Sequence, residues 1–254
     1  MKVISIVNQK GGVGKTTTAV NFASYFAQAG KRVLLIDLDP QGNATTGVGI
    51  EKNELEYSTY DVIVSGKNIN ECVISGKYNN LDILPSKIDL AGAEIELVGK
   101  MSRESKLKKK LENVKEMYDT VIVDCPPSLG LLTLNSLTAS NYVIVPIQCE
   151  FYALEGLSQL INTINLVKSE LNPLLDIGGI LLTMFDSRIK LSDEVEKEVR
   201  GYFKEKVLKS VIPRNIKLSE APSYGQPIEM YAASSKGAHA YKEAAKEVID
   251  SGIA

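Results

Sequence analysis

The residues best suited to chemistry form a glycine-rich segment near the amino terminus, Lys10-Gly11-Gly12-Val13-Gly14-Lys15-Thr16-Thr17. It lies between an apolar run and a helical pattern, so backbone N–H groups and a helix N-terminus would surround a phosphate. Lys15 is placed to neutralise the β- and γ-phosphates of a nucleotide, and the Thr16 hydroxyl to ligate a bridging Mg²⁺ ion. Gln9 stands where the usual phosphate-loop pattern has a glycine, and Lys10 would crowd Lys15 in the same loop. We therefore interpret the segment as a variant phosphate loop in which Lys10 serves a neighbouring nucleotide.

Acidic residues end two further apolar runs. Residues 34–43 read LLIDLDPQGN and contain Asp37 and Asp39, and Asp124 ends VIVD just before Cys125 and two prolines. An acid at the end of a buried strand is placed to reach the coordination shell of Mg²⁺. A single such acid could equally cap a helix or lie in a loop. Three motifs in order, each following an apolar run, favour one shared nucleotide site.

The apolar runs predict the strands that would position these residues. They are rich in Val and Ile without polar alternation, which is typical of parallel strands buried on both faces. Helical patterns cover 16–29, 153–171 and 237–250, and Gly30 suits the position after the first helix. We expect an α/β fold with a doubly wound, mostly parallel sheet flanked by helices, in one domain over 1–254, with the ligand outside the carboxyl ends of the strands. The predicted strands cover residues 3–7, 33–37, 81–85, 120–124, 142–147 and 177–184.

Composition narrows the functional classes. The chain has 254 residues, 44% of them apolar, with 29 Lys+Arg against 31 Asp+Glu, as in an ordered globular protein. No run approaches the roughly 18 apolar residues that span a bilayer, and the amino terminus lacks the features of a signal peptide, so we expect a cytoplasmic protein. Cys72, Cys125 and Cys149 are widely spaced, which favours buried reduced thiols. His239 is the only histidine in the sequence, so a histidine-dependent triad or zinc site is disfavoured.

The three motifs KGGVGKTT, LIDLDPQGN and VIVDCPPSLG together resemble the ParA/MinD superfamily of deviant-Walker P-loop ATPases. The segment IPRNIKLSEAPSYGQPI at 212–228 extends the resemblance over nearly the whole chain, to the chromosome-partitioning ParA (Soj) branch. The resemblance implies ATP and Mg²⁺ as cofactors and slow hydrolysis of ATP to ADP and phosphate. It also implies an ATP-dependent homodimer whose two protomers face each other across the nucleotides.

The same resemblance implies roles for individual residues. Lys10 would reach the phosphates of the partner protomer, and Asp39 would position or activate the attacking water, so Lys10, Lys15 and Asp39 form the catalytic set. Gly11 would lie beside Lys10 at the dimer interface. The residues that would hold or support the metal are Thr16, Asp37 and Asp124. The implied nucleotide-binding residues are Lys10, Gly11, Gly12, Val13, Gly14, Lys15, Thr16, Thr17, Pro213 and Asn215, the last two beside the adenine.

Residues outside the motifs must decide among the membrane-bound, iron–sulfur and DNA-binding members of the superfamily. The carboxyl-terminal segment 241–254 has two lysines and three acids, so we expect almost no attraction to anionic lipid. Cys125 and Cys149 lack the glycine-flanked setting of cluster ligands. Residues 200–217 carry six basic residues against one acid, Glu205. The expected DNA-contacting residues are Arg188 and Lys217, which match family positions that contact DNA, together with Arg214 and Lys209.

The sequence contains no base-reading motif beside the core, so we expect contacts to DNA phosphates without sequence preference. A second basic run, at 106–110, is interpreted as an exposed helix face. The resulting hypothesis is a nucleoid-associated partitioning ATPase whose ATP-bound dimer binds double-stranded DNA and is released when a ParB-type centromere-binding partner stimulates hydrolysis. Two alternatives remain open: a membrane-recruited, MinD-like regulator of division, and a metabolic P-loop enzyme that uses ATP to activate a small substrate.

Overall fold

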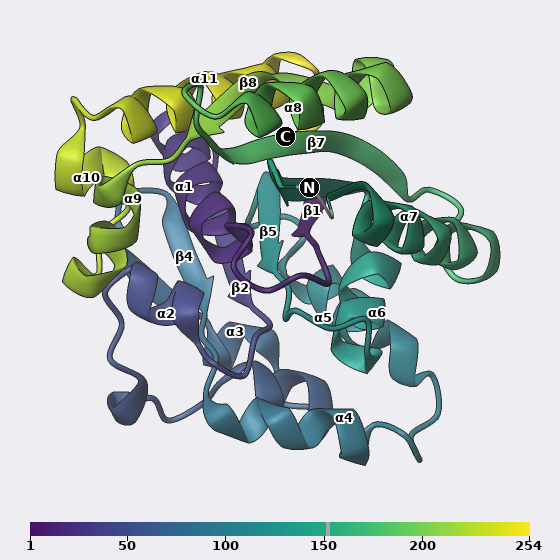
Figure 1. Cartoon of the computed structure of the whole chain (residues 1–254). Helices are drawn as coiled ribbons and strands as arrows, with labels where there is room; N and C mark the ends of the chain where they lie inside the picture. Colours follow the sequence, from purple (N-terminus) through teal and green to yellow (C-terminus); the bar gives the residue numbers. More distant parts are fainter. Residues whose placement is uncertain (151–152) are drawn as a thin grey trace.

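The computed structural model describes residues 1–150 and 153–254. Its described strands form one eight-stranded sheet in the order β3-β4-β2-β5-β1-β6-β7-β8 (Figure 1). Every neighbouring pair in this described sheet is parallel except β3 and β4, which are antiparallel. The predicted fold class is therefore confirmed. The strands are β1 (Lys2–Ile6), β2 (Val33–Asp37), β3 (Ile74–Tyr78), β4 (Leu81–Leu84), β5 (Thr120–Asp124), β6 (Tyr142–Gln148), β7 (Asp176–Phe185) and β8 (Val207–Pro213).

Helices cover both faces of the sheet. The three predicted helices are confirmed as α1, α7 and α11, and Gly30, with φ +89°, follows the end of α1. Residues 61–65 form a single π-helical turn. The helices are α1 (Lys15–Gln28), α2 (Asn43–Gly47), α3 (Ile69–Cys72), α4 (Ala93–Glu96), α5 (Lys106–Leu111), α6 (Leu131–Ala139), α7 (Ala153–Glu170), α8 (Lys190–Phe203), α9 (Ile216–Glu220), α10 (Ile228–Ala232) and α11 (Lys236–Asp250).

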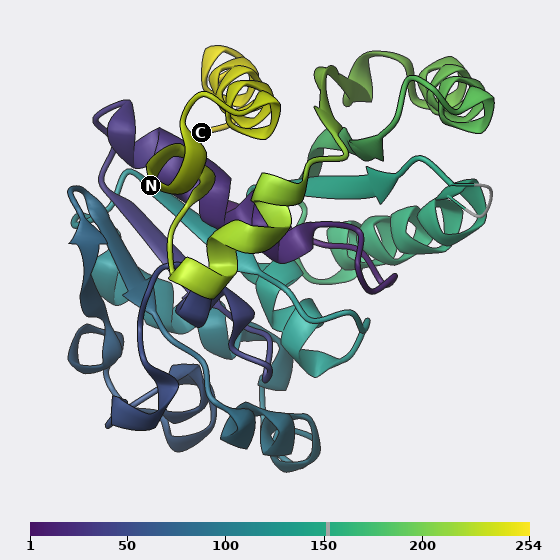
Figure 2. The ribbon, with the colours of Figure 1, turned by 60° about the vertical axis from the view of Figure 1, so that its left-hand side comes forward.

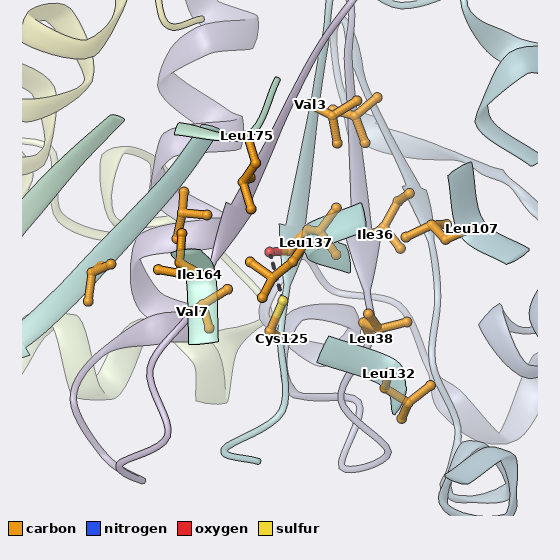
Figure 3. Packing of buried hydrophobic residues seen from close by; sticks show 14 of the residues in the cluster. Val3, Val7, Ile36, Leu38, Leu107, Cys125, Leu132, Leu137, Ile164 and Leu175 are labelled. Carbon is orange, nitrogen blue, oxygen red and sulfur yellow. Dashed lines mark hydrogen bonds between the residues drawn. The ribbon is translucent and has the colours of Figure 1, made fainter. Parts of the chain in front are cut away.

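Side-chain alternation along the central strands builds two apolar cores. In β2, Leu34 and Ile36 join the core formed with α5, α6, α7 and α8, part of which is drawn in Figure 3. Val33 and Leu35 point the other way and join the core formed with α1 and α11. These two helices contact each other on their face of the sheet (Figure 1, Figure 2). Burial on both faces explains why these strands are mostly apolar, without polar alternation.

Two strands, β3 and β8, do not appear among the predicted ones. Both lie at the edges of the sheet, and each carries polar residues, in ISGKY and VLKSVIP. An edge strand needs no apolar residue at each position, so its sequence lacks the signal that marks the central strands. The short helices α2 and α3 fall in residues 43–80, where the sequence has no clear periodicity.

The cysteines and the basic run at 106–110 are as predicted. Cys72, Cys125 and Cys149 are all free and buried. Burial raises the pKa of both the Cys125 and the Cys149 thiol to about 12, so these thiols stay protonated at neutral pH. The basic run forms α5, which buries its leucines and exposes Lys108 and Lys109, while Lys106 and Lys110 are half-buried.

Candidate nucleotide-binding site

The phosphate loop connects β1 to α1 at the carboxyl edge of the sheet. Gly12 and Gly14 have φ angles of +75° and +88°, values that only glycine adopts readily. Gly14 is the N-cap of α1, and no side chain of the described residues caps this helix. The N–H groups of its first turn therefore remain available for an anion.

Lys15 and Asp124 place opposite charges beneath this loop. The Lys15 side chain is buried, and its Nζ donates a hydrogen bond of 3.1 Å to the Lys10 carbonyl oxygen. Burial lowers the pKa of Lys15, an effect that the charge of Asp124 opposes. Register brings the acids together, because Asp124 at the end of β5 pairs with Ile6 of β1 and with Asp37 of β2.

The Asp124 carboxylate is fully buried, and neither of its oxygens has a hydrogen-bond partner among the described residues. Burial and the neighbouring Asp37 raise the pKa of Asp124 well above its usual value. The Thr16 hydroxyl faces the carboxylate and partly offsets this rise in its pKa, although the two groups lie outside hydrogen-bond geometry. A buried carboxylate in this state needs a cation nearby.

The oxygens of Asp124 and Thr16 fit a hard cation such as Mg²⁺. Mg²⁺ is commonly held by one or two protein oxygens, with phosphate and water oxygens completing its coordination shell. The described residues contain no cluster of three or more His, Cys, Asp or Glu side chains arranged to hold a metal alone. The donor set therefore suits an ion that arrives with a nucleotide.

Asp37 differs from Asp124 because its carboxylate already has partners. Oδ2 accepts hydrogen bonds from the backbone N–H and the hydroxyl of Thr45, at 2.8 and 2.7 Å, and Oδ1 accepts one from the Asp39 N–H at 3.2 Å. Thr45 Oγ1 in turn accepts a 2.9 Å hydrogen bond from Ser86 N–H. Burial raises the pKa of Asp37 to about 6. Its contacts hold the loop after β2, and its expected support of a metal stays a prediction.

Asp39 lies in that loop and faces a cavity of about 340 Å³. Its side chain is buried, and Oδ1 accepts a hydrogen bond of 2.9 Å from Gln41 N–H, which restrains the carboxylate. The phosphate-loop residues lie across the same cavity from Asp39. The cavity is lined by Gly11, Gly12, Gly14, Lys15, Thr16, Thr17, Asp39, Gln41, Asn43, Pro127 and Met184.

A second cavity of about 400 Å³ continues from the first, since Gly14, Thr17 and Met184 line both. Pro213 and Asn215, expected beside the adenine, lie in its wall at the end of β8. Asn215 also caps α9, because its Oδ1 accepts a hydrogen bond of 2.8 Å from Lys217 N–H. The two cavities together provide an elongated space with a charged end and a largely apolar end.

Lys10 and Gly11, at the start of the phosphate loop, are both exposed. Lys10 is exposed and forms a 2.9 Å ion pair with Glu150. A Cβ atom added to Gly11 would meet no atom of the described residues within 4 Å. Their expected positions at a dimer interface stay predictions.

The expected DNA-contacting residues lie on the surface and are partly paired with acids. Arg188 is 86% exposed and contacts Asp186 at 2.7 Å, while Lys217 contacts Glu220 at 2.9 Å. The hydrogen bond from Arg188 lowers the pKa of Asp186 to about 2, and the nearby positive charge of Arg214 adds to this effect. Lys209 is exposed as well.

Two other basic residues of 200–217 contribute to the fold. The Arg200 guanidinium donates hydrogen bonds to the carbonyl oxygens of Leu208 and Lys209, and Lys206 contacts Asp176 at 2.9 Å. The basic surface available to a ligand is therefore smaller than the residue count suggests.

Comparison with known proteins shows the family to which this chain belongs. A family model described as an AAA domain matches residues 1–177. The chain is 57% identical over 251 residues to the sporulation initiation inhibitor protein Soj of Bacillus subtilis, covering 99% of each chain. The chain belongs to the ParA/Soj family of chromosome-partitioning ATPases. The ParA protein of Myxococcus xanthus is another family relative, 50% identical over 248 residues, with 98% of this chain and 88% of that protein covered.

A solved structure supports the fold and the nature of the site. Cobyrinic acid a,c-diamide synthase from Mycobacterium smegmatis, crystallised with ADP and magnesium, is 39% identical to this ParA/Soj chain. The match has a TM-score of 0.85 and covers 97% of this chain and 93% of that one.

Sequence reasoning missed the residues that support the phosphate loop and the Asp39 loop. Thr183 Oγ1 on β7 donates a 2.9 Å hydrogen bond to the Val13 carbonyl oxygen, and Thr45 links Asp37 to Ser86. Both threonines are buried polar residues next to apolar stretches, a pattern that signals hydrogen bonding but does not reveal the partner.

Proposed function

We propose that this protein binds ATP and Mg²⁺ in the two connected cavities, hydrolyses the ATP, and uses the nucleotide to control a DNA-binding dimer. The observation that carries the proposal is the buried Asp124 carboxylate, which lacks a hydrogen-bond partner in the described part of the chain and lies near Lys15 and Thr16. A protein gains nothing from leaving such a group unpaired unless a ligand supplies the cation.

Different residues of the site act in nucleotide binding and in hydrolysis. The phosphate-loop N–H groups and Lys15 bind the phosphates, while Asp124 and Thr16 hold the metal ion. That ion, when bound, stabilises negative charge on the phosphate oxygens. Asp39, restrained by Gln41 N–H, orients the attacking water and accepts its hydrogen bond.

Dimerisation and DNA binding follow from the surface residues. Lys10 is exposed and a Cβ on Gly11 would meet no described atom within 4 Å, which supports a dimer contact here that includes the bound ATP. Two protomers combine two basic surfaces around Arg188 and Lys217, and the second surface then binds DNA at high effective concentration. A ParB-type partner ends this state by stimulating hydrolysis. We infer a cytoplasmic protein associated with the nucleoid.

The structure gives no support to the membrane-recruited alternative. The apolar face of α11, which includes Tyr241, Ala244 and Val248, is buried inside the protein. In the described part of the chain, no helix combines the length and the apolar character needed to cross a membrane.

The metabolic alternative has one observation in its favour, the similarity to a protein described as a cobyrinic acid a,c-diamide synthase. That identity is 39%, lower than the 57% and 50% to partitioning proteins. ATP hydrolysis that requires a small acceptor molecule would favour this alternative.

The first experiment measures DNA binding of the Asp39→Ala protein with ATP, with ADP and without nucleotide at several salt concentrations. We expect binding with ATP only, with a log–log salt slope of about −0.9 for each phosphate neutralised. Lys15→Ala provides the control that cannot hold ATP. ATP-bound dimers that fail to bind DNA would overturn the partitioning function while leaving the nucleotide site intact.

A further inference from the structure

The end of β7 contains an irregularity next to the nucleotide cavities. Leu182 pairs with Val211 of β8, and Phe185 pairs with Pro213. Three steps along β7 therefore match two steps along β8, so one extra residue is inserted between Leu182 and Phe185. An insertion of this kind is a β-bulge, and bulges redirect a side chain from the position that strand alternation would give it.

Met184 is the residue whose backbone departs from strand geometry at this irregularity. Its φ angle is +52°, a left-handed value that L side chains other than Asn and Asp rarely adopt. Its neighbours are anchored on both sides. Thr183 Oγ1 donates a hydrogen bond to the Val13 carbonyl oxygen, and the Phe185 carbonyl oxygen accepts one of 2.9 Å from Arg214 N–H. These contacts hold Met184 in a conformation that an unconstrained chain would avoid.

This conformation places Met184 at the junction of the two cavities. Met184 lines the cavity that contains Asp39 and the phosphate loop, and it also lines the cavity that contains Pro213 and Asn215. A group at this junction faces the part of a nucleotide where the nucleoside joins the phosphates. The methionine side chain is flexible and polarisable, so it adapts to the surface of a sugar and a base.

We propose that Met184 is a nucleotide-contacting residue that packs against the nucleoside, and that the bulge in β7 exists to direct it there. The inference rests on the proposed function, because it requires ATP to occupy both cavities. It adds an apolar contact, carried by β7, to the contacts expected from the phosphate loop and from the end of β8. Because the contact is with the nucleoside, it stabilises ATP and ADP equally.

The test compares nucleotide affinity in variants that change the side chain but permit the backbone. Met184→Gly removes the side chain and relieves the left-handed conformation, and Met184→Leu keeps a similar apolar volume. We expect Met184→Gly to weaken both ATP and ADP about tenfold, since a buried apolar contact is lost, and Met184→Leu to stay within about threefold of the parent. Titration calorimetry with Mg²⁺ present gives the dissociation constants.

Ser102→Gly is the matched control. Ser102 has the same φ angle of +52° but is exposed and lies outside both cavities. It should leave both dissociation constants unchanged. If Met184→Gly fails to fold, Met184→Asn replaces it, because Asn tolerates the left-handed region and is too short to fill the junction.

The outcomes separate this inference from the proposed function. A parent protein that binds neither ATP nor ADP would overturn both. A parent that binds normally, with Met184→Gly and Met184→Asn equal to it, would overturn only the role of Met184. A loss confined to ATP would also overturn it, because the side chain would then act on the terminal phosphate.

Discussion

At the scale of single residues, the nucleotide site depends on buried charges that differ in how they are satisfied. Asp37 accepts three hydrogen bonds, whereas the oxygens of Asp124 accept none from the described residues. Two acids at the ends of neighbouring strands therefore have different tasks. Asp37 holds a loop, whereas Asp124 faces the charge of Lys15 and is the acid that we propose as the metal ligand.

Replacing Lys15 by Ala should abolish useful nucleotide binding, since the cation beneath the phosphate loop is lost. We expect the dissociation constant for ATP to rise by about a hundredfold or more, because several charge-assisted hydrogen bonds disappear. Lys108→Ala is the matched control, as Lys108 is exposed on α5 and lines neither cavity. Titration calorimetry measures both variants. An affinity for ATP that survives in Lys15→Ala would contradict the phosphate-site assignment.

Replacing Asp186 by Asn should tighten DNA binding in the ATP-bound state. Asp186 contacts Arg188 and competes with DNA phosphates for its guanidinium. The Arg188 side chain is 86% exposed, so solvent weakens its attraction to Asp186. We therefore expect a gain of only about threefold at low salt, and a smaller gain as salt screens the charges. Fluorescence anisotropy with a labelled duplex measures the change.

Glu194→Gln tests whether the gain depends on position. It removes the same charge from an exposed pair with Lys190 on α8. An equal gain from this variant would show that net charge alone governs affinity, and would argue against a specific contact by Arg188.

At the scale of elements, the loop after β2 and helix α2 are joined by one buried threonine. The Thr45 hydroxyl donates to Asp37 and accepts from Ser86 N–H, so α2, β2 and the segment after β4 meet at this side chain. Asp39 lies between these anchor points and cannot move independently of them.

Thr45→Val should therefore impair hydrolysis more than binding. It keeps the shape of the side chain but leaves Ser86 N–H without its acceptor, a change that costs about 1–3 kcal/mol of folding free energy. We expect kcat to fall about tenfold, because a poorly positioned water raises the activation barrier of hydrolysis. The dissociation constant for ATP should change less than about threefold, because the positioned water does not contribute to ATP binding. Thr45→Ser should restore kcat.

Thr46→Val is the control for this prediction. The Thr46 hydroxyl contacts only nearby backbone carbonyl oxygens of the same helix, those of Gly42 and Asn43, among the described residues. Steady-state kinetics and thermal unfolding on both variants separate the two roles. A normal kcat in Thr45→Val, or an equal fall in Thr46→Val, would remove the positioning role from Thr45.

At the scale of the whole molecule, the proposed switch requires a surface that a second protomer can approach closely. Gly11→Val should bind ATP and remain monomeric, because a Cβ at this position meets no described atom of its own protomer within 4 Å and would stand in the proposed interface. Gly99→Val is a matched control, since a Cβ there also meets no described atom within 4 Å.

Analytical ultracentrifugation with ATP, in the Asp39→Ala background, measures this outcome. The Gly99→Val protein should dimerise like its parent. A Gly11→Val protein that dimerises to the same extent would place the interface elsewhere.

The sequence by itself determined the central strands, and it showed that the glycine-rich loop, Asp39 and Asp124 lie at the ends of those strands. These features have local signals, since a buried strand is mostly apolar and a phosphate loop needs glycines and a lysine at set spacings. The tertiary structure alone decided that Asp37 would be satisfied by Thr45, and that Met184 would reach the nucleotide cavities through a bulge. Hydrogen-bond partners and strand register arise between segments distant in the chain, and spacing along one segment carries no record of them.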